Sequence, residues 1–238
     1  MGLFDFLTRE GRFKRHVRRM SDRDAPPEDR EASAQLLFED GGPEAIRGLL
    51  SRFDMNLTQQ LKDGKEKEWT FGLLVQLGDV VVEPLKDWLR GCKQFAWPLR
   101  LLEKMVDERA ALDMAYELLE AEQGRNMFDA TKKKALLIWL ADRRDAGAVA
   151  AAVPYVDDFD EDVRYAAAEV VIHNPDAETA GRLIQMLTRE DEDSNRLKVR
   201  LCEVLSSRAM AIDEAMVTPH LPYGYEVRSG RIQSVRGA

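Results

Sequence analysis

Apolar stretches of helical period end at regular intervals along this chain. Each stretch closes on an aliphatic residue and runs into a short polar turn. The closing residues are Leu77, Val106, Leu140, Ile172 and Leu205, separated by 29, 34, 32 and 33 residues. A second apolar stripe follows 11 or 12 positions later, for example at Leu89, Leu118 and Leu183. The pattern predicts a repeated unit of two helices and a turn, whose apolar faces are buried only when units stack.

The repeat divides the chain into three predicted segments. Residues 25–219 are expected to form an all-α array of about six helix pairs, an α-α superhelix. An insertion at residues 54–64 separates the first pair from the second. Residues 1–24 form a basic amphipathic segment and a linker, because Pro26 and Pro27 interrupt the helical pattern.

Residues 220–238 break the repeat and are predicted to form a basic tail. Within it, Ser229-Gly230 is a turn dipeptide that would place Val227 opposite Ile232 in a short hairpin. The same pairing would place Arg228 opposite Arg231, and like charges that face each other destabilise a hairpin. The sequence therefore favours a flexible tail over the hairpin.

Two of the units resemble the HEAT-repeat family. Residues 160–171 read Asp-Glu-Asp-Val-Arg-Tyr-Ala-Ala-Ala-Glu-Val-Val, which is similar to the first helix of that repeat. Residues 77–89 contain Leu-Gly-Asp, Val-Glu-Pro-Leu and Trp-Leu, which resemble its turn and second helix. Units one, three and four lack the Val-Arg-Ala-Ala core. Over residues 27–218 the resemblance implies an α-solenoid whose second helices line the concave, partner-binding side. It implies partner contacts at Lys86, Asp87, Arg90, Tyr116, Arg182 and Gln185.

Charge is unevenly distributed along the chain. The net charge is −8, but residues 1–20 carry +4 and residues 221–238 carry +2, so the body between them carries −14. Such a body repels nucleic acid backbones and attracts proteins with basic surfaces, although it is compatible with a local basic groove. The expected partner is therefore a protein, and nucleic acid is disfavoured.

Lys132, Lys133 and Lys134, with Arg143 and Arg144, form the one basic concentration of this body. It is either a solvated helix face or a phosphate-binding patch. HEAT-like proteins include alkylpurine DNA glycosylases, which follow the DNA backbone along a basic surface, and bilin lyases. Both remain alternative functions, and the surrounding acidity argues against the first. The acidic run at residues 157–162 lacks the glycine of a calcium loop, so we expect it to cap a helix rather than hold a cation.

Motifs of enzymes and cofactor sites are not found. Three histidines lack metal-ligand spacing, and Cys92 and Cys202 are expected to be buried thiols. Tryptophans are expected in the core, but Trp88, Phe95 and Trp97 form the best candidate for an exposed aromatic anchor. The sequence thus predicts a non-enzymatic scaffold or adaptor without cofactor or metal.

Residues 2–20 have apolar residues at near-helical spacing, and basic residues occupy most of the positions between them. The segment either caps the first helix pair or contacts a partner, or it lies on an anionic membrane surface. Its expected contact residues are Phe4, Leu7, Arg12, Arg15 and Arg19. Neither a membrane span nor a secretory signal is found. We therefore expect a cytoplasmic protein, with peripheral binding at the inner membrane face as an alternative.

Overall fold

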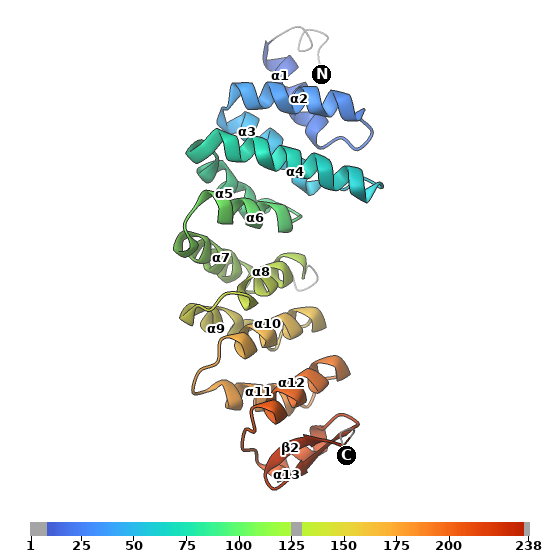
Figure 1. The fold of residues 1–238 in the computed structure, drawn as a ribbon, viewed down its shortest axis with the longest axis vertical. Helices are drawn as coiled ribbons and strands as arrows, with labels where there is room; N and C mark the ends of the chain where they lie inside the picture. Colours follow the sequence, from blue (N-terminus) through green and yellow to red (C-terminus); the bar gives the residue numbers. More distant parts are fainter. Residues whose placement is uncertain (1–8, 125–129, 236–238) are drawn as a thin grey trace. The chain divides into compact units, whose positions relative to one another are not determined.

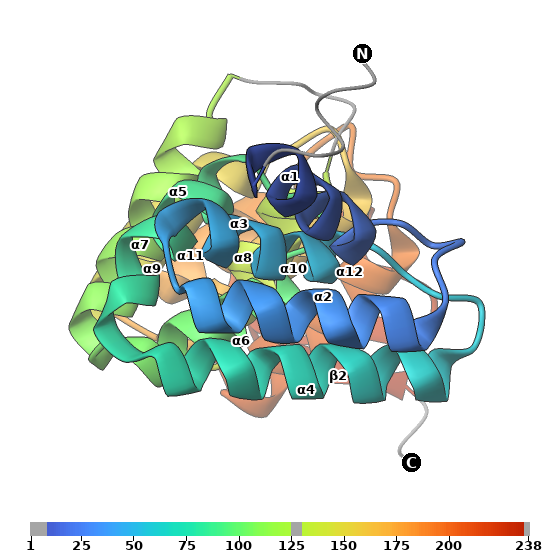
Figure 2. The same cartoon turned by 90° about the horizontal axis from the view of Figure 1, so that it is seen from above.

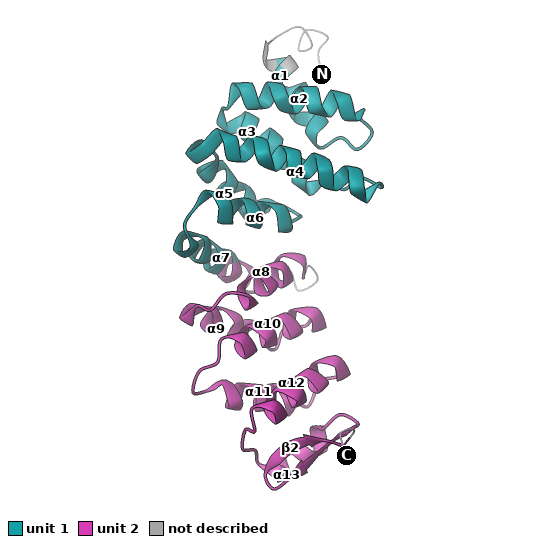
Figure 3. Cartoon of the chain, in the orientation of Figure 1, with its two compact units in different colours: residues 1–118 teal, residues 119–238 magenta. Residues whose placement is uncertain are grey.

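The computed structural model describes residues 9–124 and 130–235, which form helices and one short hairpin (Figure 1). Before residue 225 the described residues contain no strand, so the predicted all-α fold class is confirmed. The chain divides into two compact units, Met1–Leu118 and Leu119–Ala238 (Figure 3). The superhelical arrangement of the whole chain stays a prediction.

Unit 1 is a succession of helices joined by short turns. Its helices are α1 Arg9–Met20, α2 Pro27–Asp40, α3 Pro43–Leu50, α4 Gln60–Leu77, α5 Val82–Gly91, α6 Ala96–Met105 and most of α7 Glu108–Glu122. Helix α2 lies beside α4, and α4 beside α6, whereas α3 packs against α5 (Figure 2). First helices thus contact first helices, and second helices contact second helices. This is the packing expected for stacked helix pairs.

Helix α1 packs across α2 and α3. Met20 at its end is 1% exposed, and His16 Nδ1 lies 3.1 Å from Ser33 Oγ in α2. Gly48 in α3 permits close approach, since a Cβ atom there would lie 3.1 Å from a methyl carbon of Val17 and 3.0 Å from one of Leu37. The described part of the N-terminal segment therefore covers the first helix pair, as the capping interpretation requires.

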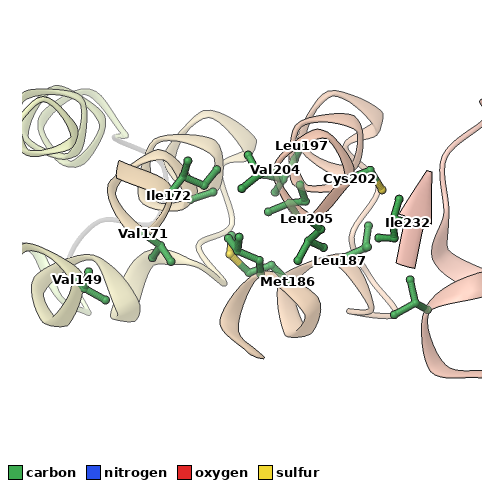
Figure 4. Close-up of a cluster of buried hydrophobic side chains, with 14 residues drawn as sticks. Val149, Val171, Ile172, Met186, Leu187, Leu197, Cys202, Val204, Leu205 and Ile232 are labelled. Atoms are coloured by element: carbon green, nitrogen blue, oxygen red, sulfur yellow. The ribbon is translucent and has the colours of Figure 1, made fainter. Parts of the chain in front are cut away.

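Unit 2 continues the same alternation of helices and turns. Its helices are α8 Thr131–Ala141, α9 Ala146–Ala152, α10 Glu161–His173, α11 Thr179–Leu187, α12 Asn195–Ser207 and α13 Glu214–Val217. Figure 4 shows the core between α10, α11 and α12, where Leu187, Leu197 and Cys202 are fully buried. Burial raises the pKa of the Cys202 thiol to about 12. Cys202 is therefore the buried thiol that the sequence predicts.

The closing residues of the repeated apolar stretches fall at or near the ends of helices. Leu77 is the last residue of α4, and Leu140 and Ile172 are the next to last residues of α8 and α10. In the acidic run, the Asp160 carboxylate accepts a hydrogen bond from the Val163 backbone N–H at 3.1 Å. A carboxylate at this position satisfies a free N–H of the first turn. The capping interpretation of the acidic run is therefore confirmed at α10.

Residues 225–234 of the C-terminal segment form the hairpin alternative rather than a flexible tail. Strands β1, Tyr225–Arg228, and β2, Arg231–Ser234, are antiparallel, with Val227 opposite Ile232 and Arg228 opposite Arg231. Strand β2 packs on α12, and Ile232 is 1% exposed. Burying such a side chain contributes about 1.5–3 kcal/mol. This outweighs the repulsion between two exposed arginines, which is on the order of 0.2–1 kcal/mol.

A buried arginine joins α10 to the loop before α12. Arg164, the fourth residue of α10, donates from Nε and Nη2 to both oxygens of Glu192, at 2.9 and 2.8 Å. Its Nη1 donates to the carbonyl oxygens of Asp158 and Phe159 in the loop before its own helix. We refer to this arrangement as the arginine clamp. Bidentate arginine–carboxylate bonds fix both distance and orientation.

The same clamp occurs in unit 1. Arg30, the fourth residue of α2, donates from Nε and Nη2 to both oxygens of Glu66 in α4, at 3.0 and 2.8 Å. Its Nη1 donates to the carbonyl oxygens of Asp22 and Ala25 in the preceding linker. Each unit therefore uses one arginine to hold a first helix, the segment before it and the next helix pair.

Candidate partner-binding surface

A series of exposed ion pairs connects the second helices of unit 1. Arg47 of α3 pairs with Asp87 of α5 at 3.3 Å, and Asp87 pairs with Arg90 at 2.9 Å. Arg90 also pairs with Glu117 of α7 at 2.9 Å. The four side chains are 48–54% exposed. These four residues are the α3–α5–α7 strip.

The position of the strip is explained by the buried apolar residues beneath it. Leu85 and Leu89 are fully buried, so Asp87 and Arg90 lie on the solvent side of α5. The hydrogen bond to Glu117 raises the pKa of Arg90, which stays charged. Exposed ion pairs of this kind contribute only about 0.2–1 kcal/mol each to stability. A partner can therefore exchange these pairs for its own contacts at little cost to the fold.

The predicted contact residues of unit 1 lie on or beside this strip. Asp87 and Arg90 are part of it, and Lys86, which pairs with Glu83 at 2.9 Å, is their neighbour on α5. Tyr116 is half-buried and directly precedes Glu117 on α7.

Sequence reasoning missed two members of the strip, Arg47 and Glu117. A signal for Arg47 was present. Phe38, near the end of α2, corresponds to Leu77 at the end of α4, and Arg47 follows Phe38 by nine residues, as Lys86 follows Leu77. Glu117 directly precedes the stripe residue Leu118, and nothing else in its surroundings marks it.

The other two predicted partner contacts lie on α11 in unit 2. Arg182 is 24% exposed and donates to Asp176 at 2.8 Å and to Glu178 at 2.6 Å. Gln185 is exposed. That a single surface carries all six predicted residues stays a prediction, because the six are divided between the two units.

The N-terminal contact residues are only partly described. Phe4 and Leu7 lie outside the described residues, and so does the side chain of Arg12. Arg15 is half-buried, and Arg19 pairs with Asp29 of α2 at 3.5 Å, which helps to hold α1 in place. None of the described helices combines the length and the apolar character that a membrane span requires.

The three lysines of the basic concentration in unit 2 are neutralised by carboxylates. Lys132 pairs with Glu122 at 2.9 Å, and Lys134 pairs with Asp162 at 3.1 Å. Lys133 is buried and pairs with Asp158 at 2.9 Å. Arg143 lies over the ring of Trp139. Because each lysine already has an anionic partner, this arrangement argues against the phosphate-binding interpretation.

The proposed aromatic anchor belongs largely to the core of unit 1. Phe95 is 4% exposed, and Trp97 stacks on Phe53 with ring centroids 5.8 Å apart. Trp88 is half-buried. The cluster is therefore wrong as an exposed anchor, because its rings contribute to packing between helices. Trp69, at 36% exposed, is more accessible and borders a pocket of about 200 Å³ beside the linker that follows α1.

The charged side chains that the structure describes include a buried group and an exposed group. Buried ones, such as Arg164 and Lys133, bond successive helices, whereas the strip is open to solvent. No group of three or more His, Cys, Asp or Glu side chains in this part of the chain is placed to hold a metal ion. What the strip can offer chemically is reversible ion pairing and hydrogen bonding.

Comparison with protein-family models, curated proteins and solved structures found no match to this chain.

Proposed function

We propose that this protein is a non-enzymatic scaffold or adaptor that binds another protein through the α3–α5–α7 strip. The observation that carries the proposal is the contrast between buried and exposed charges in unit 1. Arg30 and Arg52 are buried and bonded to Glu66, where they hold helices together. The strip is half exposed, spans three successive helix pairs and adds little to stability. Its charges are therefore available to a partner.

The alternation of charge along the strip supports a protein partner rather than a nucleic acid. A polyphosphate backbone would meet Asp87 and Glu117 as well as Arg47 and Arg90. A folded protein can place opposite charges against each of them, which gives specificity and orientation. The −14 charge of the body further favours a partner with a basic surface. We propose that this binding takes place in the cytoplasm.

The recurring helix pair also supports a scaffold. Stacked pairs extend a surface along one direction, so one partner can contact side chains that are distant in sequence. Arg47 and Glu117 are 70 residues apart, yet the pairs through Asp87 and Arg90 connect them. The resemblance to the HEAT repeat, whose second helices line the binding side, agrees with this location.

The test compares three immobilised forms of the full chain. The strip variant carries Arg47→Ala, Asp87→Ala, Arg90→Ala and Glu117→Ala. The control carries Glu68→Ala and Arg100→Ala, which remove a similarly exposed pair between α4 and α6. Proteins captured from the native cell are quantified by mass spectrometry, and helicity is checked by circular dichroism.

We expect at least one protein to be captured by the wild type and the control and to fall about tenfold or more with the strip variant, as the loss of a binding hot spot would produce. If the folded strip variant captures the same proteins in the same amounts, the strip is not the binding site.

A further inference from the structure

A groove of about 750 Å³ opens in unit 2 beside the turns that follow α8 and α10. Arg144 and Asp145 line it from the first turn, His173 and Asp176 from the second, and Arg208 from the end of α12. Its volume lies within the range of about 300–1,000 Å³ that is common for ligand sites. It is separate from the α3–α5–α7 strip, which lies in unit 1.

The two arginines of the groove have hydrogen-bond donors to spare. Arg144 is exposed and has no bonding partner among the residues that the structure describes. Arg208 donates from Nη2 to the carbonyl oxygen of Ile172 at 2.6 Å, which anchors its guanidinium at the groove. Within the described ranges its Nε and Nη1 have no acceptor. A guanidinium carries five N–H donors, so most of those in the groove are available.

The other titratable groups of the groove are already engaged by the chain. Asp145 accepts from the Gly147 backbone N–H at 2.8 Å. Both oxygens of Asp176 accept from Arg182 at 2.8 Å, and this bonding lowers the pKa of Asp176. His173 Nδ1 lies 3.0 Å from the carbonyl oxygen of Ala141. Both carboxylates are therefore held by hydrogen bonds within the chain, whereas neither arginine has a carboxylate partner among the described residues.

We propose that this groove binds an acidic peptide segment of a partner protein. Carboxylates of the segment accept bidentate hydrogen bonds from Arg144 and Arg208, the geometry that a guanidinium favours. An adjoining aliphatic side chain packs on Ala146 and Pro175, which are exposed apolar residues of the same lining. The groove thus gives the protein a second surface with a partner chemistry opposite to that of its acidic body.

The charges nearby favour a peptide over a phosphate chain. Asp145 and Asp176 stand on the walls of the groove, and the body of the protein carries −14. A chain of phosphates would be repelled along its whole length. A segment with two carboxylates flanked by apolar residues brings charge only to the arginines.

The probe is a fluorescein-labelled peptide, Leu-Asp-Leu-Glu-Leu, followed by fluorescence anisotropy at low salt. Its control is Leu-Asn-Leu-Gln-Leu, which keeps shape and loses charge. We expect the full chain to bind the acidic peptide and not the amide peptide. In the variant carrying Arg144→Ala and Arg208→Ala, affinity should fall about tenfold or more, because two charge-assisted contacts are lost.

Arg196→Ala is the matched control for loss of a positive charge, since Arg196 is an exposed arginine of unit 2 that pairs with Asp162 outside the groove. It should leave peptide affinity unchanged. Arg144→Ala alone should weaken binding measurably, and because Arg144 has no described bonding partner, it should not affect folding. The strip variant should bind the peptide normally, which separates this inference from the proposed function.

Three results would overturn the proposal. The first is equal affinity for the acidic and amide peptides. The second is an affinity for the acidic peptide that is unchanged in both the Arg144→Ala variant and the double variant. The third is displacement of the acidic peptide by inorganic pyrophosphate more readily than by the unlabelled acidic peptide, which would identify the groove as a phosphate site.

Discussion

The arginine clamps of the two units have the same donor and different acceptors. In unit 2, Arg164 binds Glu192, which is 1% exposed, lies in the loop before α12 and also accepts from the Ser194 backbone N–H. In unit 1, Arg30 binds Glu66, which is 22% exposed, lies within α4 and also accepts from Arg52. The arginine keeps its place as the fourth residue of its helix, whereas the acceptor changes its structural context.

The insertion between the first two helix pairs accounts for this difference. Part of it lengthens α4, which begins at Gln60, so a residue within the helix comes to lie where unit 2 has a loop. The helical context also brings different neighbours, because Arg52 bonds Asp63, which pairs with Lys67 one turn further along α4. The clamp therefore needs a carboxylate at one point in space, supplied either by a loop or by a helix.

The largest expected loss of unfolding free energy comes from the clamps, and it should differ between the two. Arg164→Ala leaves Glu192 buried without its main partner, and breaking such a pair costs about 3–5 kcal/mol of unfolding free energy. Arg30→Ala should cost less, roughly 1–3 kcal/mol, because Glu66 keeps Arg52 and part of its hydration. Denaturant unfolding measures both, with Arg200→Ala as the control for a more exposed bidentate pair. An equal or larger loss for Arg30→Ala would show that the acceptor's surroundings do not matter.

The two strands of the C-terminal hairpin give the next comparison. Ile232→Ala should destabilise unit 2 by about 2–4 kcal/mol, since a buried side chain is replaced by a cavity beneath the hairpin. Val227→Ala, on the facing strand and half-buried, is the matched control and should cost less than about 1 kcal/mol. Thermal unfolding monitored by circular dichroism measures both. Equal losses would mean that the hairpin does not cover the core.

Acid should weaken both clamps. Burial raises the pKa of Glu66 and Glu192, but their hydrogen bonds from Arg30 and Arg164 and the nearby positive charges outweigh it, so both folded pKa values lie below the ordinary value. The unfolded state therefore binds protons first, and the stabilisation present above the unfolded pKa is lost as pH falls through the folded pKa.

Unfolding free energy should accordingly decrease from pH 6 to pH 3, by up to about 1.4 kcal/mol for each unit of pKa difference. Glu192→Gln should reduce this slope. A pH profile of unchanged slope in that variant would exclude Glu192 as a contributor.

The smallest expected effect on stability is that of the strip. Each of Arg47→Ala, Asp87→Ala and Glu117→Ala should change unfolding free energy by no more than about 0.5 kcal/mol, because the pairs are solvent-screened. Denaturant unfolding of the single variants checks this. A loss of 2 kcal/mol, on the order of a buried interaction, would show that the strip is structural and weaken its proposed role in binding.

Local sequence patterns predicted helix ends better than they predicted long-range pairs, and they favoured a flexible tail where the structure has the alternative hairpin. Leu77 and Ile172 mark helix ends because an apolar period must stop where a helix turns away from the core. The clamp of Arg30 was missed, although Arg30-Glu31-Ala32-Ser33-Ala34 resembles Arg164-Tyr165-Ala166-Ala167-Ala168, because Asp29 replaces the valine before the arginine. Its acceptor Glu66 is 36 residues away in α4, just after the insertion, where no local rule points to it.

The two candidate surfaces also differ in how far the sequence predicts them. Asp87 and Arg90 were expected as contacts because the resemblance to the HEAT repeat implies that second helices bind partners, and both lie off the apolar stripe of one helix. The groove was not, because Arg144 and Arg208 are 64 residues apart in sequence and only packing of the turns brings them to one opening. Which arginine is bonded and which is available depends on partners in space rather than on composition.

Photo-crosslinking in the native cell tests the central claim most directly. A benzoylphenylalanine is introduced in place of Asp87 in the strip or in place of Glu68 on α4, two positions with side chains 53% and 55% exposed. We expect a protein adduct at position 87 and none of comparable yield at position 68. Adducts at position 68 but not at position 87 would contradict it.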